Sequence, residues 1–271
     1  MSRSIQSRTV CVTGASSGIG RAVAEHLGGL GAHVFLMGRT SAPMEESAAR
    51  IEAAGGRAEV SAFDITDSAA LQAWIQGAAD STGRLDALVN NAGFGDMGSI
   101  VDGDPEMWKG MLDVNVLALA VGAQAAVKAM RATGSEGNII NISSTASLRR
   151  DSGVYGATKH AVNCINGTLR AELEDDPIRV TAIMPGVFAT NFTRNVDRAL
   201  VEGLVGAAGI TDLQFDDDGK LPEEQIAAFQ EAMSPTVGNV QHIADAVEFV
   251  MTQPIELNIE ELVIRPQKSL F

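Results

Sequence analysis

The chain contains a single tyrosine, Tyr155, and Lys159 follows it four positions later in the run YGATKHAV. Two residues four apart share a face of an α-helix, so the ammonium group of Lys159 can stabilise the phenolate of Tyr155. A phenol ordinarily titrates near pH ~10, and a neighbouring cation lowers its pKa toward the range in which proton transfer is efficient. The pair is therefore a candidate acid–base site, although a surface helix can carry the same spacing by chance.

A second candidate site lies near the start of the chain, where the β-rich run Thr9–Thr13 leads into GASSGIG and then into a helical pattern. Gly14, Gly18 and Gly20 permit backbone angles that other residues avoid, and they let a ligand approach the backbone closely. The helix that follows offers unpaired N–H groups and a positive dipole end to phosphate. This order predicts a dinucleotide site, although the spacing GxxxGxG differs from the usual GxGxxG and could also serve tight packing.

Arg39 follows the next predicted strand, His33–Met37, after Gly38. In dinucleotide-binding folds a carboxylate at this point binds the ribose 2′-hydroxyl of NAD, whereas an arginine accommodates the 2′-phosphate of NADP. No Asp or Glu stands at this strand end. The sequence therefore predicts a preference for NADP(H), with NAD(H) as the alternative if Arg39 is only a surface charge.

These segments belong to a series of motifs that runs through the whole chain. The series is TGASSGIG at 13–20, FDITD around Asp64, NNAG at 90–93, DVNV around Asn115, NISS at 141–144, YGATK at 155–159 and PG at 185–186. In this set the sequence resembles the short-chain dehydrogenase/reductase family in its single-domain form. The resemblance implies a dinucleotide-binding α/β fold and an oxidoreductase activity.

The resemblance also implies a catalytic role for four residues. Tyr155 would be the general acid/base, and Lys159 would lower its pKa and hold the nicotinamide ribose. Ser144 would hydrogen-bond the substrate oxygen, and Asn115 would keep a helix open around a water molecule that links Lys159 to solvent. If the resemblance is set aside, the interpretation for Ser144 is a cap at a strand end, and that for Asn115 is a buried amide that is hydrogen-bonded to backbone. The loop before Tyr155 is shorter than in many relatives, which leaves Ser143 as the alternative to Ser144.

For the cofactor, the resemblance implies contacts that follow several strands in turn. Asp64 and Ile65 would meet the adenine ring, the NNAG segment would line the ribose side, and the segment after PG would close over the nicotinamide and its phosphate. The cofactor-binding residues implied in this way are Gly14, Ser16, Ser17, Gly18, Ile19, Gly20, Arg39, Asp64, Ile65, Asn91, Ala92, Gly93, Tyr155, Lys159, Pro185, Gly186, Val187 and Thr190.

Length and composition set limits on the class of protein. A chain of 271 residues with 45% hydrophobic residues is typical of one large α/β domain. A net charge of −14 argues against nucleic acid as a partner. The chain has no uninterrupted apolar stretch of eighteen residues and no secretory signal at MSRSIQSR, so we expect a cytoplasmic protein outside the membrane. Cys11 and Cys164 show no metal or redox spacing, so we expect no metal site and no disulfide.

Strand signals alternate with helical signals along the chain. This alternation predicts a doubly wound, Rossmann-type parallel sheet of about seven strands with helices on both faces, in one domain over residues 1–271. The glycine loop, NNAG, NISS and PG would then meet at the carboxyl ends of the strands. The predicted strands are Thr9–Thr13, His33–Met37, Ala58–Phe63, Ala87–Asn90, Asn138–Ile142, Arg179–Met184 and Glu260–Ile264, and the predicted helices include Gly20–Leu30, Ser68–Ala79 and Pro105–Met130.

Residues 188–240 break this alternation and are long for a connection inside a compact domain, which predicts a substrate lid. Phe188 and Phe192 at its start, together with Phe94 and Met97 after NNAG, could form an apolar wall around the reacting carbon. Each of these side chains could equally serve ordinary packing.

The sequence thus favours an NADP(H)-dependent oxidoreductase that interconverts a ketone or aldehyde with the corresponding alcohol. The alternatives are a lyase or dehalogenase reaction on the same fold and a non-catalytic NADP(H)-sensing regulator. Relatives commonly pair through the helices that carry Asn115 and Tyr155, which implies a homo-oligomer, either a tetramer or a dimer. Arg149 and Arg150 could meet an acidic substrate, or they could lie in a solvated loop or a subunit contact.

Overall fold

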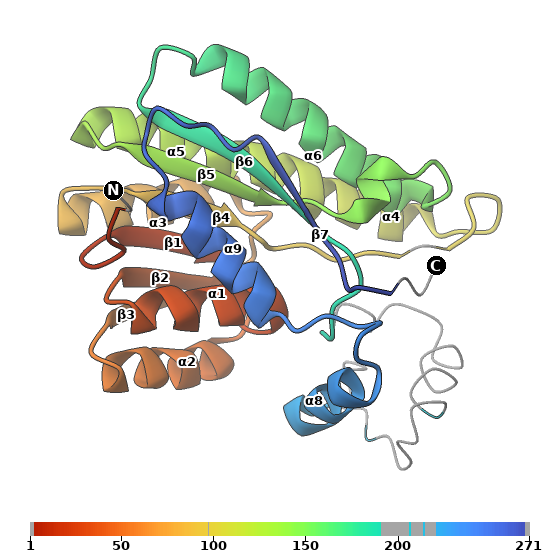
Figure 1. The fold of residues 1–271 in the computed structure, drawn as a ribbon. Coiled ribbons are helices and arrows are strands. Elements are labelled where there is room, and N and C mark those ends of the chain that lie inside the picture. The colour runs from red at the N-terminus through yellow and green to blue at the C-terminus, as the bar shows by residue number, and fades with distance from the viewer. Residues whose placement is uncertain (1–2, 97, 191–205, 207–213, 215–220, 269–271) are drawn as a thin grey trace.

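The protein is described by a computed structural model that covers residues 3–96, 98–190, 206, 214 and 221–268 (Figure 1). Its centre is a seven-stranded sheet in the order β3-β2-β1-β4-β5-β6-β7, with every neighbouring pair parallel. The order reverses between β1 and β4, which opens a crevice at the carboxyl ends of these strands. The strands are β1 (Thr9–Thr13), β2 (His33–Gly38), β3 (Arg57–Ala62), β4 (Ala87–Asn90), β5 (Gly137–Ile142), β6 (Ile178–Pro185) and β7 (Glu261–Ile264).

Helices cover both faces of this sheet, as a doubly wound fold requires. One face packs against α1, α2 and α9, and the other packs against α3, α5 and α6. The described helices are α1 (Gly18–Gly29), α2 (Ser41–Ala53), α3 (Ser68–Thr82), α4 (Pro105–Leu112), the π-helical segment η1 (Asp113–Ala118), α5 (Leu119–Thr133), the 3-10 turn η2 (Thr145–Leu148), α6 (Gly153–Glu172), α8 (Glu223–Ala232) and α9 (Gln241–Thr252).

The central strands form because their side chains are apolar on both faces. In β1, Val10 and Val12 lie in the core beneath α1, whereas Cys11 points into the core beneath α3 and α5. Every residue of β1, β4, β5 and β6 is buried, while the outer strands β3 and β7 keep exposed positions. Continuous apolar runs in the middle and mixed runs at the margins are what a parallel sheet covered on both faces produces. The predicted fold class is confirmed.

The helix predicted over Pro105–Met130 is continuous but not uniform. Asp104 caps its start by accepting a hydrogen bond of 3.0 Å from the N–H of Glu106. The π-helical turn η1 then interrupts the α-helical pattern, and α5 ends before Gly134, whose φ is 63°. By length and composition alone, residues 105–133 would suit a membrane span, yet 44% of the apolar window is buried inside the fold.

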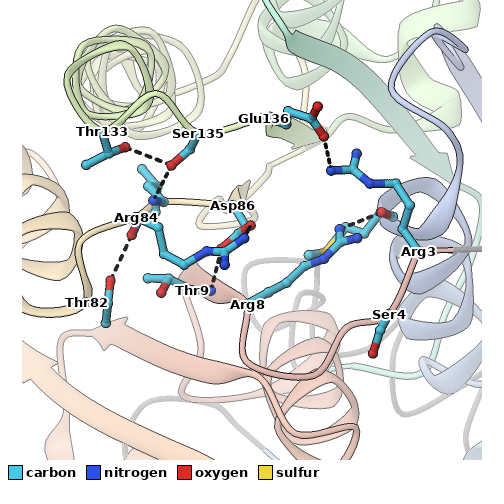
Figure 2. A network of polar contacts seen from close by, with 12 residues as sticks. Arg3, Ser4, Arg8, Thr9, Thr82, Arg84, Asp86, Thr133, Ser135 and Glu136 are labelled. Carbon is cyan, nitrogen blue, oxygen red and sulfur yellow. Dashed lines mark hydrogen bonds and ion pairs between the residues drawn. The ribbon is translucent and has the colours of Figure 1, made fainter.

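The amino ends of the strands are joined by a set of side chains that we call the amino-end network (Figure 2). Asp86, only 2% exposed, accepts hydrogen bonds from the N–H of Thr9 at 2.8 Å and from Nε of Arg84 at 2.7 Å. Arg3 pairs with Glu136. Arg8 donates a hydrogen bond of 2.6 Å to the carbonyl of Met251 at the end of α9, where the helix dipole favours a cation. The network therefore holds β1, β4, β5 and α9 together. It consists of Arg3, Arg8, Thr9, Arg84, Asp86 and Glu136.

Candidate active site

The glycine loop between β1 and α1 has the backbone angles and the close packing that its glycines predict. Gly14 and Gly18 have φ values of 66° and 56°, in the left-handed region that favours glycine. A Cβ at Gly20 would lie 2.4 Å from both the carbonyl oxygen of Gly14 and Nδ2 of Asn91. No side chain can enter at this position without displacing the loop.

Asn91, after β4, fastens this loop to the neighbouring strand. Its Nδ2 donates hydrogen bonds to the carbonyl oxygens of Thr13 at 2.9 Å and Gly14 at 3.2 Å. The hydroxyl of Thr13 in turn accepts from the N–H groups of Asn91 and Ala92, both at 3.0 Å. The side-chain amide of Asn91 is thus committed to the loop, which leaves Ala92 and Gly93 as the NNAG residues at the open side of the crevice.

The amino end of α1 fits a phosphate group. The side chain of Ser17 caps none of the first N–H groups of the helix, and unpaired N–H groups at a helix start bind anions. The methyl group of Thr190 lies 3.1 Å from the place where a Cβ of Gly18 would be, so the segment after β6 adjoins the glycine loop. Ser16 lies against Gly38 at the end of β2, and Ile19 packs on the core.

Arg39 and Asp64 stand after adjacent strands, β2 and β3. The hydrogen bonds that Thr66 donates to Asp64 lower the pKa of this carboxyl, and the charge of Arg39 lowers it further. Arg39 itself is exposed, whereas Ile65 is buried in the core. Arg39, exposed at the end of β2, is one of the residues that could hold a cofactor.

Tyr155 and Lys159 both lie on α6 and are both buried, with the Lys159 Nζ 5.8 Å from the centre of the Tyr155 ring. Nζ donates a hydrogen bond of 2.9 Å to the carbonyl of Ile142. Burial lowers the pKa of Lys159 to about 8 and raises the pKa of Tyr155 to about 12. The net pKa of the phenol in the protein alone therefore lies above its ordinary value, opposite to the expected direction, because burial is the largest influence on it.

Ser144, at the end of β5, is the serine that contacts Tyr155. The two hydroxyl groups are hydrogen-bonded, which partly offsets the effect of burial on the pKa of the phenol. Ser144 Oγ also accepts a hydrogen bond of 3.1 Å from the N–H of Ala146 and so caps the start of η2. The alternative residue, Ser143, points elsewhere, because its hydroxyl donates to Oδ1 of Asn163 at 2.8 Å.

Asn115 lies inside the π-helical segment and is 1% exposed. Its Oδ1 accepts from the N–H of Phe94 at 3.1 Å, and its Nδ2 donates to the carbonyl of Phe94 at 2.8 Å and to Thr158 Oγ1 at 3.1 Å. A Cβ at Gly93 would lie 3.0 Å from Oδ1 of Asn115 and 3.7 Å from Nζ of Lys159. Gly93 therefore lies directly beside Asn115 and Lys159, and any side chain at this position would crowd the oxygen of Asn115.

Comparison with known proteins agrees with this geometry. A family model described as short chain dehydrogenase matches residues 8–201. The chain belongs to the short-chain dehydrogenase family. A Staphylococcus epidermidis protein named only as an uncharacterized oxidoreductase is 31% identical over 264 residues, which cover 97% of this chain and 98% of the relative. A similar protein of Methylorubrum extorquens, also named as an uncharacterized oxidoreductase, is 36% identical over 212 residues, which cover 77% of this chain and 84% of the relative.

Two solved structures extend the comparison to the fold. A metagenomic short-chain oxidoreductase in complex with NADP is 30% identical, with a TM-score of 0.74 and coverage of 98% of this chain and 100% of the other. A short-chain dehydrogenase from Burkholderia cenocepacia, also in complex with NADP, is 29% identical, with a TM-score of 0.77 and coverage of 97% and 98%.

In this short-chain dehydrogenase, the segment after β6 returns to the sheet. The N–H of Gly186 donates to the carbonyl of Ile264 at 2.8 Å, and the carbonyl of Val187 accepts from the N–H of Gly238 at 2.9 Å. Phe188 packs on the core beneath α1 and α9, and its ring lies against Gly238. A short parallel bridge also joins Phe188 to Gly238, and the expected place of Phe188 in the substrate wall stays a prediction. Pro185 is buried at the end of β6.

Of the other predicted wall residues, Phe94 packs in a small apolar cluster that contains Tyr155, Met111 and Ala146. Met97 and Phe192 lie outside the described residues, as does most of the lid predicted over 188–240. The described part of that segment includes α8.

The basic loop before α6 makes its own ion pair. Arg149 forms a bidentate contact with Asp151, at 2.8 and 3.0 Å, and the carbonyl of Arg149 is hydrogen-bonded to His160 at 2.8 Å. Arg150 is exposed. With its guanidinium held by Asp151, Arg149 is a poor candidate for an acidic substrate.

Three polar residues of the site were not predicted from the sequence. Thr13 joins the glycine loop to NNAG, Thr158 joins Asn115 to α6, and Asn163 joins α6 to both sides of Ser144. Thr13 and Thr158 lie inside the motifs TGASSGIG and YGATK, so these motifs already marked both residues as candidates for the site. Asn163 lies one helical turn after Lys159 on the same face, a position that the spacing rule used for Tyr155 would have found.

Proposed function

We propose that this short-chain dehydrogenase is an NADP(H)-dependent oxidoreductase that interconverts a ketone or aldehyde with the corresponding alcohol. The observation that carries the proposal is the arrangement of Tyr155. Its buried phenol is hydrogen-bonded to Ser144 and stands beside Lys159, whose Nζ adjoins Gly93 of the NNAG segment. The Ser144 hydroxyl can donate a hydrogen bond to a substrate oxygen, and the adjacent Tyr155 phenol can give a proton to that oxygen or take one from it.

The residues present fit a nicotinamide dinucleotide. The start of α1 would hold the pyrophosphate, Lys159 would hold the ribose next to the nicotinamide, and Arg39 would meet a 2′-phosphate. The bound cofactor supplies the hydride. NADP in the two related structures supports the choice of cofactor.

The protein's own residues would handle the oxygen and the proton. In reduction, Ser144 donates a hydrogen bond to the carbonyl oxygen, and Tyr155 delivers its proton to the alkoxide that forms there. In oxidation, Tyr155 takes the proton from the alcohol. A cation at Lys159 favours the phenolate left after donation, and the apolar cluster around Phe94 limits water near the phenol.

The reaction is tested by following nicotinamide absorbance with a panel of small ketones, aldehydes and secondary alcohols. We expect oxidation of NADPH with at least one carbonyl compound and formation of the matching alcohol. Conversion of a substrate without any net change in the cofactor would instead indicate a lyase or dehalogenase reaction. Tight NADPH binding without turnover across the panel would support the sensing regulator.

The cofactor preference is tested by fluorescence titration with NADPH and NADH. Because a charge-assisted hydrogen bond to phosphate is lost, we expect Arg39→Ala to weaken NADPH binding about tenfold and to leave NADH binding unchanged. Arg57→Ala is the matched control, since Arg57 is an exposed arginine at the opposite end of the neighbouring strand β3. An equal loss of NADPH affinity in both variants, or no loss in either, would contradict the role of Arg39 in binding the 2′-phosphate.

A further inference from the structure

Asn163 lies on α6 one turn after Lys159, and its side chain reaches the loop that carries Ser144. Its Oδ1 accepts a hydrogen bond of 2.8 Å from the hydroxyl of Ser143. Its Nδ2 donates a hydrogen bond of 3.0 Å to the hydroxyl of Ser147. These two partners flank Ser144 in the sequence, so a single amide holds the loop on both sides of the serine.

The contact continues from Ser147 to Ser144 itself. The hydroxyl of Ser147 donates a hydrogen bond of 2.6 Å to the carbonyl oxygen of Ser144. Because this uses the one proton of that hydroxyl, Ser147 can only accept from Asn163, and the amide of Asn163 must present its N–H₂ group there. If the amide of Asn163 were flipped, its oxygen would face the hydroxyl oxygen of Ser147, and both atoms would be acceptors. The hydrogen bonds therefore allow only one orientation of the Asn163 amide. Ser143 and Ser147 are each 3% exposed, so water has little access to replace the amide.

We propose that Asn163 is a positioning residue that sets the Ser144 hydroxyl against the Tyr155 phenol by tying the serine loop to the helix that carries Tyr155 and Lys159. The inference rests on the proposed function for its kinetic consequence. The structural link does not depend on that function, because the coupling of Asn163, Ser144 and Tyr155 can be measured without turnover.

Tyr155 is the only tyrosine in the chain, so the phenolate absorbance reports on this residue alone. Because the pKa of this phenol is raised to about 12, we would compare the onset of phenolate formation below the midpoint, within the pH range where circular dichroism shows an intact fold. Ser144→Ala should raise the pKa of the phenol, because the hydrogen bond from Ser144 lowers it. Lys159, whose Nζ lies 5.8 Å from the centre of the ring, is unchanged in every variant. We expect Asn163→Ala to shift the titration in the same direction, and Ser144→Ala/Asn163→Ala to match Ser144→Ala alone.

Ile165→Ala is the matched control, since Ile165 is a part-buried residue of the same helix without a polar side chain. It should titrate like the wild type. Ser147→Ala removes the intermediate hydroxyl and should behave like Asn163→Ala, which keeps the test open if Asn163→Ala does not fold. Additive shifts in the double variant, a wild-type titration of Asn163→Ala, or an equal shift in Ile165→Ala would each overturn the proposal.

In the working enzyme, Asn163→Ala should lower kcat about 10- to 100-fold, as expected for a small misplacement of a catalytic group, with NADPH affinity unchanged. An unchanged kcat would overturn the positioning role in catalysis. A coupled titration in a protein that reduces no carbonyl compound would overturn the proposed reaction and still support the link between Asn163 and Ser144.

Discussion

The two ends of the same parallel sheet use their polar side chains in opposite ways. At the amino ends, buried Asp86 accepts from Arg84 and from the backbone of Thr9, so its charge is matched within the chain. At the carboxyl ends, Lys159 is equally buried but makes no ion pair among the described residues, and its ammonium bonds only to the carbonyl of Ile142. The polar groups at the amino end therefore stabilise the fold. At the carboxyl end, burial disfavours the charged forms of Tyr155 and Lys159.

The largest expected effect tests the carboxyl end. Tyr155→Phe removes the hydroxyl that transfers the proton, so we expect kcat to fall about 10³-fold, which is about 4 kcal/mol. NADPH affinity and the thermal midpoint should stay close to those of the wild type, because the ring still fills its apolar cluster. Steady-state kinetics and fluorescence titration measure both quantities. A variant that keeps more than a tenth of wild-type kcat would rule out Tyr155 as the proton donor.

The next effect breaks the amino end. Asp86→Ala leaves the guanidinium of Arg84 and the N–H of Thr9 without their partner, so we expect a loss of about 3 kcal/mol in the free energy of unfolding. Urea denaturation measures it. Turnover per folded molecule should not change, since the network lies at the opposite end of the strands. Asp80→Ala, at an exposed helical position, is the control and should cost less than about 0.5 kcal/mol. A comparable loss in both variants would contradict the structural role of Asp86.

The smallest effect concerns pH. Lys159 has its pKa lowered from 10.5 to about 8 in the folded protein. Between these values the unfolded chain binds more protons, so the contribution of Lys159 to stability rises with pH, by about 2 kcal/mol from pH 8 to pH 10. Lys159→Met should lack this rise, and the difference between the two unfolding curves measures it. A difference that is constant across this pH range would show that burial does not perturb the lysine.

The sequence predicted the central strands most closely. β1 and β4 begin and end where expected, because interior parallel strands are short, continuous apolar runs between clear turn residues. The π-helical turn around Asn115 was not foreseen as such, since an apolar helical pattern continues through it. Its cause is a set of distant contacts, with Phe94 and Thr158, that no local pattern contains.

For the site, type and spacing identified the residues but not their surroundings. Tyr155 and Lys159 were expected from their four-residue spacing, and the structure brings them together. The direction of the Tyr155 pKa was missed because the sequence does not display burial, which is the largest influence on this pKa and raises it. Phe188 was assigned to the substrate wall from its position after PG, and no local pattern indicates its pairing with Gly238 or its contact with the core.

The contact between Arg8 and Met251 also bears on how the chain folds. The two residues are separated by 243 positions, and the N–H of Arg3 likewise bonds to the carbonyl of Thr252. Contacts of such long sequence separation form late, because a long loop must close before they are gained. A ribosome-bound chain that ends before α9 has neither the carbonyl partner of Arg8 nor the helix that covers α1. β1 is thus synthesised long before α9, and the contacts between Arg8 and α9 form only after α9 has left the ribosome.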